Sequence, residues 1–118
     1  MSSVHIELHY EGHHGCDSIC DVLIEHGTDA ILVTVTERDD NPGTSITNCA
    51  EIVATQIART MPSASMPEVR FVEHYPTDPN GSFDEVTFTW TERQASGAQW
   101  RHLGVGGYHQ LRAELGVP

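Results

Sequence analysis

The sequence predicts an α+β domain: a mixed, mostly antiparallel sheet of about five strands, with one long helix packed on one face and a short C-terminal helix. Two stretches carry this prediction. Ala30–Glu37 alternates, with apolar or β-branched side chains on both faces, as expected of an interior strand that is covered on both sides. The stretch over 46–61 then places apolar side chains on one helical face, at Ile46, Ala50, Val53, Ala54, Ile57 and Met61.

The long helix is expected to pack on the strand that precedes it. We predict that Val53 and Ile57 lie in the core and face Val33 and Val35 of that strand. Pro62 ends the helix, because proline disfavours helical geometry at the residue before it. Thr44 or Ser45 is the favoured N-cap, and an earlier start at Asn41 or a later one at Asn48 are alternatives.

The N-terminal part predicts two strands and a hairpin. Val4–Tyr10 alternates like a half-buried strand, and its inward side chains are expected to be Val4, Ile6, Leu8 and Tyr10. Ile19–Glu25 predicts a second strand, although the stretch is short enough to be a helical turn. His26–Asp29 then predicts a hairpin turn into the central strand.

After the long helix, Glu68–Tyr75 predicts the next strand. A strand–helix–strand connection favours a right-handed crossover, which makes this strand parallel to Ala30–Glu37. Phe83–Thr91 alternates clearly, with Val86, Phe88 and Trp90 on one face, and predicts a further strand.

The C-terminal part predicts a loop, a brief extended piece and a helix. Arg93–Gln99 is expected to be a loop, Trp100–Leu103 a short extended piece and Gly104–Gly107 a flexible connector. Tyr108, Leu111 and Leu115 then have helical spacing, which predicts a short helix that ends at Gly116. We expect residues 1–118 to form one domain, since a chain of this length can bury roughly two-thirds of its unfolded surface.

The charge balance is strongly acidic. The chain has 17 acidic residues against six arginines and no lysine, a net charge of −11. This balance argues against direct nucleic-acid binding, which needs cations to displace phosphate counterions. An acidic chain can instead present carboxylates to a basic partner, although the same charge also serves solubility.

The sequence also predicts the compartment. No apolar run approaches the roughly 20 residues that a membrane-spanning helix needs. The N-terminus MSSVHIELHY lacks the regions of a secretion signal, so we expect a cytoplasmic protein with no membrane contact. The chain has three cysteines, an odd number, and they are expected to be free thiols.

Two stretches, ERDDNPGTSITNCAE and VEHYP, resemble segments of small uncharacterised bacterial proteins. The resemblance covers roughly Ile31–Phe88. It implies no known activity, and it contributes no catalytic residue.

Polar side chains follow the central predicted strand, Ala30–Glu37. Others lie at the carboxyl end of Glu68–Tyr75, the strand that is expected to be parallel to it. The carboxyl ends of such strands meet beside a helix N-terminus, where ligands favour binding. Hard cations such as Mg²⁺ prefer oxygen ligands, and a helix N-terminus can hold an anion. The alternative is a solvated turn with helix caps. The candidate ligand-binding residues are Glu37, Asp39, Asp40, Asn41, Thr44, Ser45, Glu73 and His74.

A second candidate is a metal site near the N-terminus, formed by His13, His14, Cys16, Cys20 and His26. Thiolates and imidazoles are the ligands of zinc-type sites. The spacing matches no standard zinc finger or ribbon, so a polar loop with buried thiols is the alternative. A third alternative is nucleophilic catalysis by Cys49 or Ser45 with His74, and we assign no catalytic residue from it.

Glu73 is an anomaly in its strand. It shares a face with Val69, Phe71 and Tyr75, whereas His74 points to the other face. A buried carboxylate is costly unless it is paired or hydrogen-bonded. We therefore predict that Glu73 accepts hydrogen bonds from Thr44, Ser45 or the backbone N–H groups at the helix start.

The leading functional prediction is a small acidic binding protein, which acts as an inhibitor or regulator of a basic protein partner or associates with itself as a homodimer. The alternative is a small metal-dependent hydrolase that uses the acidic loop with a divalent metal as cofactor. The sequence leaves open whether the protein is an enzyme.

Overall fold

A computed structural model describes residues 3–11, 17–28, 30–37, 53–55, 68–75, 82–91 and 94–118. These residues form an α+β fold with a mixed sheet and a C-terminal helix. The sheet has six strands in the order β1-β2-β3-β4-β5-β6. Its elements are β1 (Ser3–Glu11), β2 (Asp17–His26), β3 (Ala30–Glu37), β4 (Glu68–Tyr75), β5 (Ser82–Thr91), β6 (Gln94–His102) and helix α2 (Gly104–Leu115).

One pair of neighbouring strands, β3 and β4, is parallel, and the other pairs are antiparallel. The predicted parallel pairing of these two strands is therefore confirmed, with Val33 opposite Phe71. The predicted hairpin between β2 and β3 is also confirmed. Its turn is closed by the Gly27 N–H, which donates to the Ala30 carbonyl at 2.8 Å.

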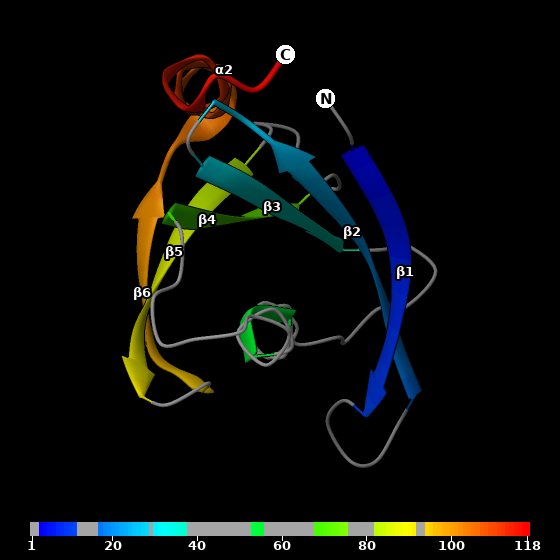
Figure 1. Ribbon diagram of the computed structural model, residues 1–118. Helices are drawn as coiled ribbons and strands as arrows, with labels where there is room; N and C mark the ends of the chain where they lie inside the picture. The colour runs from blue at the N-terminus through cyan, green and yellow to red at the C-terminus, as the bar shows by residue number, and fades with distance from the viewer. Residues whose placement is uncertain are drawn as a thin grey trace.

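The sheet curves into an arch, and Figure 1 shows the helical turn at 53–55 beneath it and α2 on its outer side. Val53 and Ala54 of this turn are buried in a core that lies under the arch. The other buried members of that core are Cys20, Val22, Val33, Val35, Phe71, Val86 and Phe88. The burial of Val53 is thus confirmed. The rest of the long helix predicted over 46–61, Ile57 included, lies outside the described residues.

A second core lies between the outer side of the sheet and α2. It consists of Ala30, Leu32, Val72, Tyr108, Leu111, Leu115 and Val117. The helix ends as predicted at Gly116, whose φ of 71° suits glycine, and its N–H donates to the Ala113 carbonyl. No helix in the described part of the chain is long and apolar enough to cross a membrane.

The number of strands and the structure of one connector differ from the prediction. The sixth strand, β6, occupies most of the stretch that was expected to be a loop. Its small polar residues show little alternation, so the sequence did not predict a strand there. The strand forms because this stretch pairs with β5. Gly97 has a φ of 61° there, next to an irregularity in the β5–β6 register. The Gly104–Gly107 stretch forms the first turn of α2. Packing of the helix against the sheet outweighs the low helix propensity of glycine.

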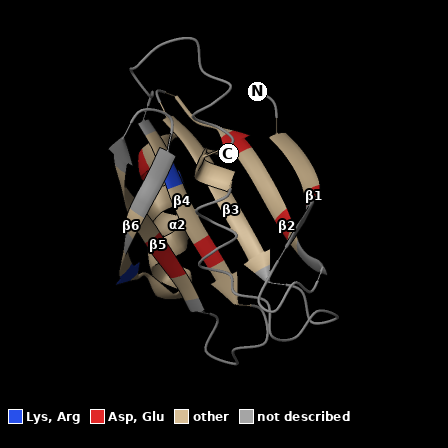
Figure 2. Cartoon of the chain, turned by 90° about the horizontal axis from the view of Figure 1, so that it is seen from below, with Lys and Arg blue, Asp and Glu red and all other residues tan. Residues whose placement is uncertain are grey.

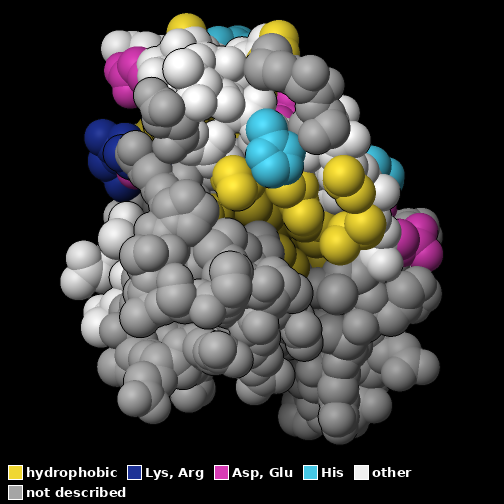
Figure 3. All heavy atoms as spheres, viewed as in Figure 1, with side chains coloured by type: hydrophobic (Ala, Val, Ile, Leu, Met, Phe, Trp, Pro, Cys, Tyr) yellow, Lys and Arg dark blue, Asp and Glu magenta, His cyan; other side chains and the backbone are white. Residues whose placement is uncertain are grey.

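The first strand is less buried than predicted. Val4 and Ile6 lie on the inner side of the arch, opposite Ile24 and Val22, but they remain 46% and 40% exposed. Their position explains the difference, because β1 is an edge strand of the sheet and the inner core centres on β2 to β5. Figure 3, which looks into the end of the arch, shows hydrophobic side chains gathered beneath the sheet.

Candidate functional site: a hollow beside helix α2

The outer side of the sheet carries an open hollow next to α2, with a volume of about 380 Å³. Such a volume suits a small molecule or a single side chain of a partner. The hollow is lined by residues from β1 to β5 and from α2, namely His5, Asp21, Leu23, Thr34, Thr36, His74, Phe83 and Tyr108.

The strand register places half of this lining in one row across the sheet. Asp21 lies opposite Thr36, Thr36 opposite His74, and His74 opposite Phe83. Side chains that face each other on neighbouring strands have Cβ atoms about 5 Å apart. The row therefore places a carboxylate, a hydroxyl, an imidazole and a phenyl ring side by side on the outer face. Glu7 of β1 continues the row beyond Asp21.

Three rings of the lining form an aromatic stack, which we define as His74, Phe83 and Tyr108. Phe83 lies between the other two, with ring centroids 4.2 Å from His74 and 4.1 Å from Tyr108 and nearly parallel planes. The Tyr108 hydroxyl is hydrogen-bonded to the Thr34 hydroxyl at 2.9 Å. The stack thereby fixes the orientation of His74 from two neighbouring elements, β5 and α2.

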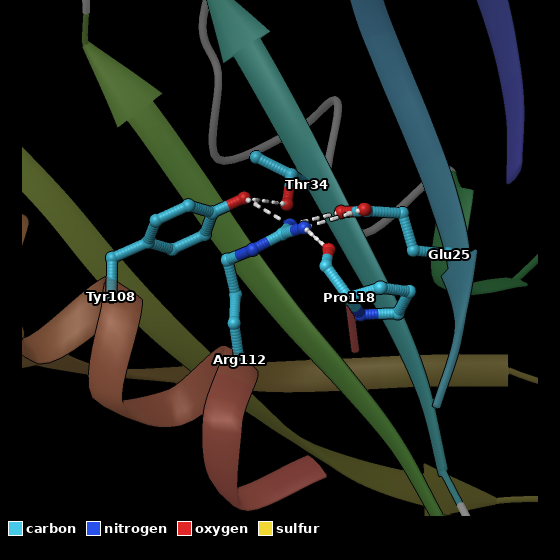
Figure 4. Close-up of polar contacts among 5 residues, drawn as sticks. All are labelled: Glu25, Thr34, Tyr108, Arg112 and Pro118. Carbon is cyan, nitrogen blue, oxygen red and sulfur yellow. Dashed lines mark hydrogen bonds and ion pairs between the residues drawn. The ribbon is translucent and has the colours of Figure 1, made fainter. Parts of the chain in front are cut away.

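Arg112 holds the α2 end of the aromatic stack. Its guanidinium carbon lies 5.7 Å from the centre of the Tyr108 ring, and Nη1 also donates to the Tyr108 hydroxyl at 3.4 Å. Both terminal nitrogens, Nη1 and Nη2, donate to the Glu25 carboxylate, Nη2 at 2.8 Å, and Nη2 also donates to the Pro118 carbonyl at 2.6 Å. Figure 4 shows these contacts converging from β2, β3, α2 and the C-terminus. Hydrogen bonding to Glu25 raises the pKa of Arg112, so this cation stays charged.

The described lining of the hollow carries one acidic side chain and two imidazoles, His5 and His74. Asp21 is the only acid among the described lining residues, and its carboxylate lies 3.7 Å from the His5 imidazole. Burial lowers the pKa of His74, which favours the neutral form of its ring. The lining that the structure describes contains no lysine or arginine. A positively charged group is therefore the electrostatic complement of this hollow.

The three arginines of the described residues all pair with carboxylates of the chain itself. Arg70 and Arg101 lie 3.0 Å and 2.9 Å from the buried carboxylate of Glu85, and Arg112 pairs with Glu25. Figure 2 shows acidic positions spread over several strands and cationic positions towards β4 and β6. The described cations therefore neutralise internal carboxylates.

The structure separates two residues of the predicted acidic site. His74 lines the hollow, whereas Glu73 is fully buried under the arch, where the Tyr75 hydroxyl donates to its carboxylate at 2.8 Å. The predicted burial of Glu73 is confirmed. Because adjacent strand residues point to opposite faces, Glu73 and His74 cannot share one site.

The acidic loop itself is not tested by these residues. Glu37 ends β3 opposite Cys20, and its side chain lies outside the described part. The predicted residues Asp39, Asp40, Asn41, Thr44 and Ser45 also lie outside the described residues, and so do the predicted hydrogen bonds from Thr44 and Ser45 to Glu73. The metal-dependent hydrolase stays a prediction.

Two members of the predicted metal site are described, and they lie apart. Cys20 and His26 are six residues apart on β2, about 20 Å along a strand. Cys20 is buried and disulfide-bonded, so the prediction of free thiols is wrong for it. Its partner among the two other cysteines, Cys16 and Cys49, lies outside the described residues, as do His13 and His14. The described residues contain no cluster of three metal-ligating side chains.

Of the residues that line the hollow, His74 alone was among the predicted site residues. Asp21 with Leu23, and Thr34 with Thr36, have the i, i+2 spacing that places side chains on one face of a strand. That spacing was visible in the sequence. The register that sets Asp21 opposite Thr36 was not, because it depends on pairing between strands.

Comparisons with protein-family models, curated proteins and solved structures found no match.

Proposed function

We propose that this protein is a small acidic binding protein that recognises a basic protein partner and regulates it by occupying its cationic surface. The observation that carries the proposal is the charge of the hollow. A carboxylate, Asp21, lies in a concave surface with hydroxyls and aromatic rings, and the described lining residues include no lysine or arginine. Such a surface complements a positively charged group.

The net charge of −11 supports the same proposal at longer range. A strongly charged protein attracts a partner of opposite charge and raises the association rate, and salt screens this attraction. The described arginines are engaged with Glu25 and Glu85, and the whole chain has 17 acidic residues against six arginines. Binding of a basic partner should therefore weaken as the salt concentration rises.

The test uses two fluorescent peptides of equal length, one rich in arginine and one with glutamine at the arginine positions. Fluorescence anisotropy measures their binding to the full chain at about 50 mM and about 500 mM NaCl. We expect the basic peptide to bind at low salt and to lose at least about tenfold in affinity at high salt, while the glutamine peptide does not bind. Absence of binding by the basic peptide at low salt would contradict the proposal.

Self-association is checked in the same samples. Size-exclusion chromatography with light scattering distinguishes a monomer of 13.0 kDa from a homodimer of twice that mass. A homodimer that binds no basic peptide would favour self-association over a basic partner as the role of the acidic surface.

A further inference from the structure

We infer that the hollow is a socket for a guanidinium group, the end of an arginine side chain on the basic partner. The inference rests on the proposed function and adds the residue type that the hollow selects. A guanidinium is planar, carries a permanent positive charge and stacks on aromatic rings, whereas an ammonium is a compact and strongly hydrated point charge.

The orientation of His74 provides the flat surface. One face of its ring lies on Phe83 of β5, with a centroid distance of 4.2 Å and an angle of 5° between the planes. The opposite face of the His74 ring therefore points away from Phe83 along the row, towards Thr36 of β3 and Asp21 of β2. A planar group that stands above Thr36 would lie against this face.

Asp21 provides the charge. It lies two strands away from His74 in the same row, and the residue between them is the small Thr36. Neighbouring strands are about 4.8 Å apart, so the backbones of Asp21 and His74 are roughly 10 Å apart with β3 between them. The space above Thr36 lies between their two side chains. A guanidinium in this space lies close to the Asp21 carboxylate and can donate a hydrogen bond to the Thr36 hydroxyl.

An arginine of the chain itself lies at the other end of the aromatic stack. There the Arg112 guanidinium lies 5.7 Å from the centre of the Tyr108 ring and pairs with the Glu25 carboxylate. Arg112 thus combines an aromatic ring with a carboxylate partner, which is the combination we infer for a partner's arginine at His74 and Asp21. Burial favours the neutral form of His74 by lowering its pKa, and a neutral ring does not repel a guanidinium.

The test titrates the full chain with three small probes: acetyl-argininamide, acetyl-lysinamide and acetyl-citrullinamide. Citrulline has the shape of arginine without its charge. Amide ¹H–¹⁵N spectra report both affinity and location. We expect acetyl-argininamide to bind most tightly and to shift Asp21, Thr36 and His74, acetyl-lysinamide to bind several-fold more weakly, and acetyl-citrullinamide not to shift them. Equal binding of the lysine and arginine probes, or shifts confined to other surfaces, would overturn the inference.

Two variants with the same change of charge sharpen the test. Asp21→Asn removes the carboxylate of the hollow. Asp84→Asn is the matched control, since Asp84 also lies beside a histidine, His102 at 2.9 Å, but on the inner side of the sheet, opposite Glu73. We expect Asp21→Asn to weaken acetyl-argininamide by about tenfold and Asp84→Asn to leave it unchanged. The dispersion of each spectrum checks that the variant is folded.

The variants also separate this inference from the proposed function. If the arginine-rich peptide binds wild type, Asp21→Asn and Asp84→Asn with equal affinity, the acidic surface binds basic partners and the hollow is not the socket. If the arginine-rich peptide does not bind wild type at all, the proposed function fails, and the inference fails with it. A selective loss in Asp21→Asn supports both.

Discussion

Replacing Glu25 with glutamine removes the charge that holds Arg112, and we expect this single change to destabilise the protein strongly. The two side chains, Arg112 and Glu25, are 20% and 12% exposed, so water can replace little of what is lost. Arg112 joins β2 to α2 and to the C-terminal Pro118, and it lies over the Tyr108 ring of the aromatic stack. Loss of the ion pair therefore loosens the attachment of α2 to the sheet.

The magnitude follows from the contacts. Each hydrogen bond between charged groups contributes about 1.5–3 kcal/mol, and breaking a buried ion pair costs about 3–5 kcal/mol. Arg112 keeps its bonds to Pro118 and Tyr108, and the glutamine side chain in Glu25→Gln still offers one acceptor, so we expect a loss of about 2–3 kcal/mol. For 118 residues, an unfolding entropy of about 2.1 cal/mol/K per residue converts this loss to a drop of about 8–12 °C in Tm.

Urea unfolding followed by circular dichroism measures the loss, and Glu114→Gln is the matched control. Glu114 is an exposed residue of α2 whose hydrogen-bond partner is Gln110 at 3.4 Å, and its change should stay within about 0.5 kcal/mol. A double-mutant cycle with Arg112→Met isolates the pair, and we expect a coupling energy of at least about 1 kcal/mol. Equal stability of Glu25→Gln and Glu114→Gln would refute the reasoning.

Three further predictions address the turn, the core and the hollow. Gly27→Ala would place a methyl group 2.0 Å from the Leu115 carbonyl oxygen, so thermal unfolding should show a loss of about 1–3 kcal/mol, and Thr28→Ala next to it should be milder. Phe71→Ala removes a 2% exposed ring that packs edge-on against Phe88, and urea unfolding should show a loss of about 3–5 kcal/mol; a loss below about 1 kcal/mol would place Phe71 outside the core. Burial lowers the pKa of His74, so the unfolded chain binds a proton more readily and stability should fall as the pH drops below about 6.5; the stability difference between wild type and His74→Gln should show this slope.

Local patterns in the sequence predicted the elements whose own residues determine them. The alternation in β3 and β5 and the spacing of Tyr108, Leu111 and Leu115 were read correctly, since each reflects burial of a continuous face. Only the end of the edge strand β6 was predicted, as the extended piece at Trp100–Leu103. The rest of β6 has no alternating pattern of its own and becomes a strand by pairing with β5. Val4 and Ile6 were expected to be buried, and alternation alone cannot tell that a strand lies at the end of a sheet.

The hollow was harder to predict because it is a property of the register. His74 was identified from its place at the end of a strand, but its neighbours in the row come from β2, β3 and β5. Each of these residues, seen alone, is an ordinary polar or aromatic residue of a strand. They become a site when three pairings bring them to one line, and pairings between distant strands leave no local signal.

The register of β4 also decides which of two adjacent residues can bind a ligand. Phe71 is anchored in the inner core, and Glu73 and Tyr75 follow it on the same face, where the Tyr75 hydroxyl donates to the buried carboxylate. A shift of β4 by one residue would turn Phe71 out of the core and carry His74 in, at the cost of the best-buried ring of the described sheet. Burial of Phe71 therefore holds His74 in the hollow. The inner face of the strand maintains the fold, and this frees the outer face to carry the imidazole towards Asp21.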